Sequence, residues 1–462
     1  MKQNITVQCS MKNTFNNNWL LFIIATQPIL DIAAFFTFSS NVTIISFATR
    51  SIYLFVIIIY SFISVSNKRQ YMLMMLPLIV LSIIHLANSI RTSGLNIFDD
   101  IRYLVIVMQL PASTIALTFY ARENKGASLQ LEKGILAAII IIFISVILSL
   151  LTHTGKNTYE TFGLNGWFTS PNAQSMILST ISPMVLYISA KKNNIIYISV
   201  SLMIFILLFF NGTRACYYSL VAMLFVMLYI LLTTSTVDRN KVAVLVTLIL
   251  IVSTLGFYKY SASLSRTNDV NKNAKAFKIK ISENPTKEEA YKIMRNSPLT
   301  KQMIEDLGFE WTYNNMKEHI SAYNLSDNRL TKRMYAKYIY EHSDNFTKIV
   351  GFNHGDIEKY GMDLENDLTA LYYYYGYLGT VIFISYILIC VIQAFKLIIH
   401  EPKIIFGSKF VMLCFTIVLA IGGAEYSGAL LRKPNANIYL SVIIALLLNY
   451  IYRRGVGEDV YE

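Results

Sequence analysis

The chain repeats one pattern that limits its fold more than any other feature: long apolar stretches, each near the roughly 20 residues that a helix needs to cross a bilayer. Inside the hydrocarbon the backbone must satisfy its own hydrogen bonds, so spans of this length form helices. The sequence therefore predicts an all-α, polytopic integral membrane protein with about twelve transmembrane helices. The predicted spans lie near residues 19–38, 44–64, 71–90, 101–121, 134–152, 171–190, 194–210, 216–233, 241–260, 368–398, 404–426 and 437–452.

The composition agrees with lipid as the solvent. Hydrophobic residues make up 54% of the chain and charged residues 15%, whereas soluble proteins average about 25% charged residues. The first apolar stretch is too long for the core of a signal peptide, so no cleaved leader is expected. The four cysteines show no metal-ligand spacing and predict no disulfide framework.

Basic residues collect on the cytoplasmic side of membrane proteins, and their distribution orients the chain. With the N-terminus inside, the inner segments hold sixteen: Lys2, Lys12, Lys68, Arg69, Arg122, Lys125, Lys133, Lys191, Lys192, Arg239, Lys241, Lys396, Lys403, Lys409, Arg453 and Arg454. The short outer segments hold seven: Arg50, Arg91, Arg102, Lys156, Arg214, Arg432 and Lys433. We therefore expect a multi-pass protein of the cytoplasmic membrane with both termini in the cytoplasm. The net charge of +12 then needs no nucleic-acid partner.

The spans divide the chain into three parts. Residues 1–260 carry predicted helices one to nine, and residues 368–462 carry helices ten to twelve with a short cytoplasmic tail. Residues 261–367 form one large extracytoplasmic loop. This loop contains sixteen basic and sixteen acidic residues, so it is neutral and soluble in character.

The loop has helix signals of its own. Thr286 to Glu289 reads as a capping box after a proline. Residues 326–328 are suited to cap a helix from Arg329 to about His342. Gly308 and Gly351 are typical helix stops. We expect a mainly helical loop domain.

The basic residues outside the membrane differ in kind from those inside. Five of the seven outside are arginines, against five of the sixteen inside. Arginine offers a planar fork of donors suited to phosphate, while lysine is a hydrated point charge. Snorkelling to the interface explains any single arginine, such as Arg50 or Arg102, but not an arginine excess on this side. A site for an anionic lipid headgroup such as a pyrophosphate does predict that excess.

Two short segments stand at the outer ends of spans. The turn 211–214 holds Arg214 close to hydrocarbon, where a charge is costly and indicates function; the alternative is an ordinary interfacial arginine. In the segment 166–172, Ser-Pro-Asn is typical of a helix start, and Asn172 with its aromatic neighbours is a candidate contact for a sugar or phosphate. The alternative there is an interfacial tryptophan and a simple cap.

Glu365 and Asp367 lie where the large loop re-enters the membrane. Glycosyl transfer to a hydroxyl needs a general base, and a carboxylate here is a candidate. The alternative is a helix cap with a favourable dipole contact. Gly376 and Gly379, which follow nine residues counted from Asp367, allow close helix packing.

The remaining titratable residues carry weaker signals. His354, in a predicted loop, is a candidate substrate contact but is more typical of a solvated side chain. The sequence has no metal-ligand spacing and no nucleotide motif, so no metal or cofactor is expected. The pair at 99–100 beside Arg102 is a charged feature of the rim.

Taken in order, these segments resemble the O-antigen ligase and polymerase superfamily of bacterial envelope enzymes. Gly166 to Asn172 is similar to that family's G-x-F-x-x-P-N stretch, and Gly212 to Arg214 to its short turn with a Ser/Thr-Arg pair. The run from Glu365 to Gly379 matches in spacing the family's pattern of His and a polar residue, nine residues, and Gly-x-x-Gly. Ligases of the family have His where this chain has Glu365, whereas polymerase-like relatives look like they carry Glu followed by Asp, as at Asp367.

The resemblance implies a GT-C-like fold and an inverting, metal-independent glycosyltransferase that uses undecaprenyl-pyrophosphate-linked oligosaccharide. It implies that Arg214 holds the pyrophosphate, that Glu365 is the base, and that a family arginine of the loop corresponds to Arg329 or Arg333. A polymerase would use a second lipid-linked repeat unit as acceptor, with other polysaccharide-assembly proteins as partners. A ligase would use a different lipid or wall acceptor, and a transporter or flippase is a further alternative. Transporters usually have two similar halves, whereas here a large loop separates nine spans from three.

Overall fold

The computed structural model describes residues 17–37, 40–93, 97–159, 162–233, 241–265, 268, 286–317, 328–406, 409–428 and 430–457. These residues are predominantly helical. Within them, the strands β1 (Lys156–Tyr159) and β2 (Phe162–Gly166) form one short antiparallel hairpin. The prediction of an all-α polytopic membrane protein is confirmed.

Twelve helices of the described ranges coincide with the predicted spans. They are α2 (Asn18–Thr37), α3 (Ser40–Ser64), α4 (Lys68–Ser93), α5 (Phe98–Glu123), α6 (Ala127–Leu151), α7 (Pro171–Ala190), α8 (Asn194–Phe210), α9 (Arg214–Thr233), α10 (Lys241–Gly256), α19 (Asp367–His400), α20 (Lys409–Ser427) and α21 (Pro434–Gly455). In the same ranges, nine helices are long and apolar enough to cross a membrane, and α8 and α10 are shorter apolar helices. The span expected from residue 404 begins later, because the separate 3₁₀ turn η5 (Pro402–Ile405) precedes α20.

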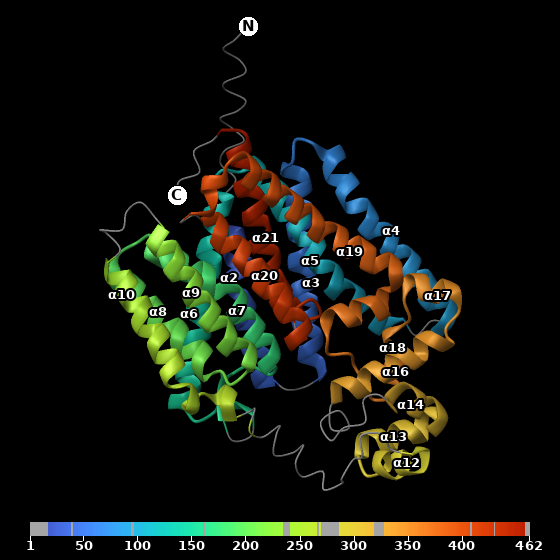
Figure 1. Ribbon diagram of the computed structural model, residues 1–462. Coiled ribbons are helices and arrows are strands. Elements are labelled where there is room, and N and C mark those ends of the chain that lie inside the picture. The colour runs from blue at the N-terminus through green and yellow to red at the C-terminus, as the bar shows by residue number, and fades with distance from the viewer. Residues whose placement is uncertain are drawn as a thin grey trace.

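The helices form a central and an outer layer. Most of α5, α7 and α21 is buried, and α5 packs along α21 (Figure 1). Polar side chains join these central helices: the Asn437 amide donates to the carbonyl of Ile106 at 2.8 Å, and the Ser441 hydroxyl to that of Leu110 at 3.1 Å. Such bonds hold helices together where lipid gives no hydrophobic drive. Outer helices such as α3, α4, α10 and α19 instead expose aliphatic side chains.

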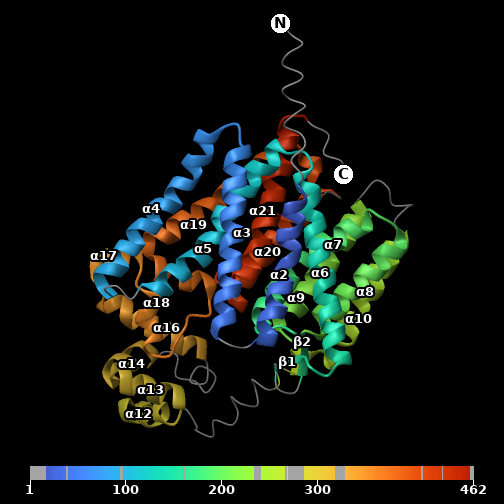
Figure 2. The same cartoon turned by 180° about the vertical axis from the view of Figure 1, so that it is seen from behind.

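The two ends of the bundle differ. At one end, the Tyr120 hydroxyl donates to the Asn17 side chain at 2.7 Å, and Arg453 donates to the carbonyl of Ala121 at 3.2 Å. These bonds join the start of α2 to the ends of α5 and α21. The helices between residues 287 and 358 lie at the opposite end in both views (Figures 1 and 2). We call the first the terminal end and the second the loop end.

Local signals explain the loop helices. The capping box at Thr286 and Glu289 is present, and Gly308 and Gly351 end helices with φ of 82° and 91°, so these predictions are confirmed. The expected cap residues 326–327 lie outside the described residues. The loop helices are α12 (Lys287–Arg295), α13 (Pro298–Leu307), α14 (Phe309–Met316), α16 (Asn328–His342), α17 (Asn345–Val350) and α18 (His354–Glu358); the 3₁₀ turn η3 (Tyr258–Tyr260) follows α10.

Two glycines attach the loop to the membrane helices. Gly376 interrupts α19 with φ 60° and ψ −164°. A Cβ on Gly376 would overlap the backbone of Ile349, and one on Gly351 would overlap the backbone of Tyr374. Only glycine combines a positive φ with so close an approach. The end of α17 thus packs directly against the kink in α19, and this contact fixes the position of the loop relative to the bundle.

We predict that the loop end faces outward and the terminal end faces the cytoplasm, because lysine and arginine prefer the cytoplasmic side. The test uses single cysteines at exposed positions in a background without native cysteines. On intact cells, a membrane-impermeant thiol reagent is expected to label Glu288→Cys, in α12, without lysis. Lys192→Cys, after α7, should label only after lysis. The reverse pattern would refute the orientation.

Candidate functional site

Arg432 is the centre of the loop end. It lies in the short segment between α20 and α21 and is buried. Its Nε donates to Asp367 Oδ1 at 3.0 Å, and its Nη1 donates to Asp363 Oδ1 and to the Tyr103 hydroxyl, both at 2.9 Å. Burial opposes the charge, but Tyr103, Asp363 and Asp367 outweigh it and raise the pKa of Arg432. The guanidinium is therefore a permanent cation. It joins α5 and α19 to the helical hairpin formed by α20 and α21, which we call the hairpin below.

Asp367 serves the same junction from within the protein. Its side chain is fully buried, and Oδ2 accepts from the backbone N–H groups of Leu430 and Leu431 at 2.7 and 2.8 Å. Oδ1 is used by Arg432. Both oxygens are thus bonded to the hairpin, and Asp367 presents no free face to a substrate.

The backbone of Glu365 is held by the same hairpin. Arg432 Nη2 donates to the carbonyl of Glu365 at 2.9 Å and to that of Gly428 at 3.1 Å. Gly428 has φ +68°, and a Cβ there would overlap the Glu365 carbonyl oxygen. Glycine is required at this position both for its conformation and for its lack of a side chain.

The Glu365 side chain has a different environment from that of Asp367. It is 31% exposed, Oε1 accepts from Lys332 Nζ at 2.7 Å, and Oε2 accepts from Arg329 Nε at 2.9 Å. Burial raises the pKa of the Glu365 carboxyl, but the hydrogen bonds and charges of Lys332 and Arg329 outweigh it and lower the pKa below its ordinary value. Glu365 is therefore an ionised carboxylate that solvent reaches.

Glu365 does not cap α19. The first-turn N–H groups of Leu368 and Thr369 are instead bonded by the Glu425 carboxylate of α20, at 3.2 and 3.4 Å, and the Thr369 hydroxyl donates to Glu425 at 3.0 Å. Asn366, the residue at the cap position, makes no side-chain cap bond. The capping alternative for Glu365 is thus met by a residue that is distant in the sequence.

His354 packs into the wall of the site. Its ring stacks on Tyr103 with centroids 4.0 Å apart, and its Nε2 lies 3.7 Å from Asp363 Oδ1. Its backbone N–H donates to Asp100 at 2.6 Å. Burial raises the pKa of the Asp363 carboxyl, but His354 and Arg432 outweigh it and hold the pKa well below its usual range. His354 is therefore not a solvated loop residue.

Arg102 and Lys433 carry positive charge that no carboxylate in the described residues pairs with. The pKa of Lys433 is lowered, mainly by burial and by the charge of Arg432, with a smaller contribution from Arg102. The carboxylates at 363 and 367 raise it, but they do not outweigh these effects. Arg102 lies over the ring of Phe47, 5.8 Å from its centroid. This local excess of positive charge makes Arg102 and Lys433 candidates for binding an anion.

A second basic position lies across α20. In the turn before α9, the Asn211 amide donates to Gln174 Oε1 at 3.2 Å and holds Thr213 through its other atom at 2.9 Å. Arg214 follows as the first, partly exposed residue of α9. Asn172 lies at the start of α7, where Ser170 caps the helix and a proline fills its first position, as predicted.

The end of α20 separates this second group from Glu365. A Cβ on Gly423 would come within 2.6 Å of Met176 of α7, so α20 and the first turns of α7 lie in contact at the loop end. Two residues beyond Gly423, Glu425 binds the start of α19. The group around Arg214 and the group around Glu365 are therefore neighbours on the same end of the bundle, with α20 between them.

The two remaining predicted residues are Arg50 and Arg333. Arg50 is buried, pairs with Asp31 at 2.7 Å and donates to Gln27 at 3.1 Å. Asp31 also accepts from Asn435 at 2.9 Å. Arg333 lies on α16, one residue after Lys332, and its Nε is buried without a hydrogen-bond partner. In our interpretation Arg50 braces the bundle.

The structure thus brings together Glu365, Asp367, Arg329, His354 and Arg102 of the predicted residues. Sequence reasoning did not single out Arg432, which bonds the Asp367 side chain and the Glu365 carbonyl, and it missed Asp363, Tyr103, Lys332, Lys433 and Glu425. The available signal was the set of basic residues in the predicted outer segments, which includes Arg432 and Lys433. Among the described residues, no group of three or more His, Cys, Asp or Glu is arranged to hold a metal ion.

The fold and this site define a polytopic α-helical membrane protein with a charged site where a helical loop meets the bundle. A family model described as O-antigen ligase like membrane protein matches residues 12–454, and the chain belongs to that family. The family indicates a glycosyltransferase-type enzyme of the O-antigen ligase and polymerase kind. No curated protein matches the chain.

We predict that Arg432→Met lowers the stability of the purified protein by about 3 to 5 kcal/mol, the usual cost of leaving a buried charge unpaired. Asp367 would lose its cation while remaining fully buried. Thermal unfolding in detergent measures the change. The control is Lys287→Met, which breaks a half-exposed pair with Glu310 and should leave the melting temperature nearly unchanged. Equal melting temperatures for both variants would contradict the anchoring role of Arg432.

Proposed function

We propose that the chain is a polysaccharide polymerase of the cytoplasmic membrane. It transfers a glycan from undecaprenyl pyrophosphate to another lipid-linked repeat unit at the outer face. The observation that carries this proposal is the position of Glu365, an ionised and partly exposed carboxylate at the same end of the bundle as Arg102 and Lys433, two cations with no carboxylate partner among the described residues. Arg432 links them, since it bonds the Glu365 carbonyl and directly precedes Lys433.

In this proposal each side chain has one task. Arg102 and Lys433 bind the pyrophosphate of the donor and stabilise its charge as it leaves. Glu365 removes the proton from the acceptor hydroxyl as the hydroxyl oxygen attacks the anomeric carbon. The bond to the pyrophosphate oxygen breaks as the new glycosidic bond forms, so a single displacement inverts the configuration. Asp367, which is buried, positions Arg432 rather than touching substrate.

The second basic position favours a polymerase over a ligase. A polymerase binds two lipid-linked glycans, and each carries a pyrophosphate. Arg214 lies across α20 from Arg102 and Lys433. Asn172, which the family resemblance also singles out, lies at the same end of the bundle as Arg214. Two separate cationic positions, one on each side of α20, suit two such substrates. A ligase with a different acceptor would need only one of them.

Glu365→Gln is expected to slow polymerisation by about 10² to 10⁴, the usual worth of general-base assistance. Glutamine keeps the size and some hydrogen bonding of Glu365 but removes the proton acceptor. Purified protein and lipid-linked repeat unit in a polymerisation assay measure the rate. The matched control is Glu310→Gln, which also removes a carboxylate bonded to a loop lysine, at 2.6 Å, and should keep wild-type turnover.

The pH profile supplies a second readout in the same assay. The ionised form of Glu365 is the active one, and Lys332 and Arg329 lower its pKa, so activity should persist to acid pH and fall only as pH drops through the lowered pKa. In Lys332→Met the pKa rises, so activity should be lost at a higher pH. Near-wild-type turnover of Glu365→Gln, or an unmoved profile in Lys332→Met, would eliminate Glu365 as the base.

Arg214→Lys is expected to abolish polymer formation while the protein still inserts in the membrane. Lysine keeps the charge but loses the planar, bidentate fork that fits a phosphate. Polymer length on cells and protein level in membranes are the two measurements. If the variant retained single transfers to a soluble acceptor, the defect would lie in binding the second lipid-linked substrate. Polymer of normal length would rule out this role.

A further inference from the structure

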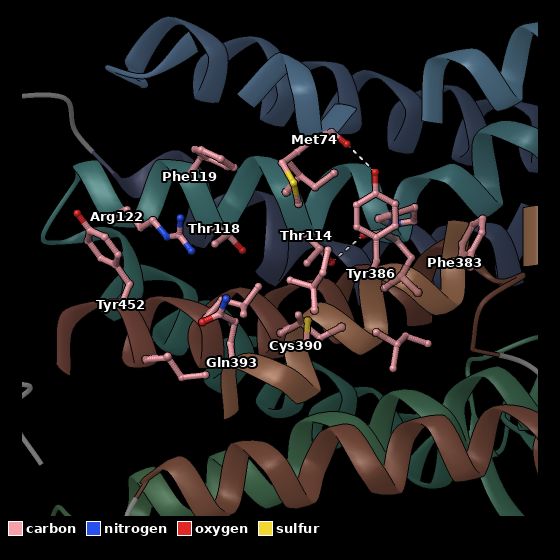
Figure 3. Close-up of a pocket in the computed structure, with 18 of the residues that line it drawn as sticks. Met74, Thr114, Thr118, Phe119, Arg122, Phe383, Tyr386, Cys390, Gln393 and Tyr452 are labelled. Atoms are coloured by element: carbon pink, nitrogen blue, oxygen red, sulfur yellow. Dashed lines mark hydrogen bonds between the residues drawn. The ribbon is translucent and has the colours of Figure 1, made fainter. Parts of the chain in front are cut away.

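A cavity of about 640 Å³ lies within the bundle and reaches from the terminal end to Leu368 and Leu431, which adjoin residues of the site described above. It is bounded by α4 and α5 on one side and by α19 and α21 on the other, mostly in the half of the bundle near the terminal end. Figure 3 shows Arg122 and Tyr452 at one end of it, with Phe383 and Tyr386 toward the other. The proposed chemistry at the loop end does not use this space.

The wall of the cavity presents hydrocarbon. Its side chains are mainly aliphatic and aromatic, and several of its polar groups are bonded within the protein. The Tyr386 hydroxyl donates to the carbonyl of Met74 at 2.5 Å, and the Thr114 hydroxyl donates to that of Leu110 at 2.8 Å. Polar groups whose bonds are already satisfied do not compete for a ligand. The cavity therefore suits an alkyl chain.

The terminal end of the cavity is basic. Arg122, Lys396 and His400 line it there, and no carboxylate occurs among its described lining residues. The Arg122 guanidinium lies over Phe119 and Tyr452, at 5.4 and 4.9 Å from the ring centroids. Its Nε is buried and has no hydrogen-bond partner in the part of the chain that the structure describes. A side chain held between two rings in this way does not simply reach out to water.

We propose that this cavity binds an anionic phospholipid of the leaflet at the terminal end. The phosphate contacts Arg122 and Lys396, and one acyl chain enters between α5 and α19. The charge complementarity argues for this occupant, since an acidic headgroup supplies the acceptor that the Arg122 Nε lacks among the described residues. The inference does not depend on the proposed polymerase activity.

Native mass spectrometry of the purified, delipidated protein tests the proposal. The lipids added are phosphatidylglycerol and phosphatidylcholine with the same acyl chains. Each Lys or Arg near an anionic leaflet strengthens binding by about five- to sixfold. The double variant Arg122→Gln/Lys396→Gln should therefore bind phosphatidylglycerol about thirtyfold more weakly. Thr114→Trp, or Cys390→Trp from the opposite wall, fills the cavity without changing charge and should also prevent binding; melting temperatures confirm that each variant is folded.

The matched control is Lys191→Gln/Lys192→Gln, which removes two charges after α7, at the same end but outside the cavity lining. It should bind phosphatidylglycerol like the wild type. Equal binding of phosphatidylcholine, equal loss in the control, or normal binding by folded Trp variants would overturn the proposal. Displacement of phosphatidylglycerol by undecaprenyl phosphate would also overturn it. That result would assign the cavity to a polyprenyl chain that enters from the loop end, at Leu431.

Discussion

The buried charge of Arg432 is the interaction on which the loop end of the molecule depends. Removing a guanidinium from water costs several kcal/mol, and one carboxylate rarely compensates for that cost. Here Tyr103, Asp363 and Asp367 and two backbone carbonyls share the donors of Arg432. Because these partners come from α5, from the end of the loop and from α19, the charge is satisfied only when all three are in place. The ion cluster therefore specifies one geometry for the segment that carries Glu365.

This arrangement separates two acidic residues that are neighbours in the sequence. Asp367 faces the hairpin and is fully buried, while Glu365 turns its carbonyl to Arg432 and its carboxylate to Lys332 and Arg329. A rigid, preorganised carboxylate needs no rearrangement when charge develops, which is how polar sites lower barriers. The backbone of Glu365 also lies so close to Gly428 that a side chain at residue 428 would displace it. Asp367 thus stabilises the fold around Arg432, and Glu365 keeps a carboxylate that solvent reaches.

The sequence predicted the helices well because lipid imposes a single simple rule on every span, and caps such as that at Thr286 are local. It also singled out Glu365, Asp367 and Arg102 as separate candidates, since all lie at boundaries of predicted outer segments. It did not find Arg432, whose partner Tyr103 lies on a helix distant in the chain. The local rule for capping failed at α19 for the same reason, because Glu425 of α20 supplies the cap. Partners chosen by tertiary contact leave no pattern in neighbouring residues.

The basic residues of the predicted outer segments, which we interpreted at first as one signal, fall into two physical classes. Arg432 and Arg50 are buried against carboxylates, so their charges are neutralised and stabilise the fold. Arg102 and Lys433 have no such partner among the described residues, and the lowered pKa of Lys433 reflects burial first, then repulsion by Arg432, with a smaller contribution from Arg102. A cation that the fold leaves uncompensated is unfavourable until an anion arrives. Neutralisation therefore distinguishes the basic residues that hold this structure together from those available to bind a phosphate, which a count of charges does not.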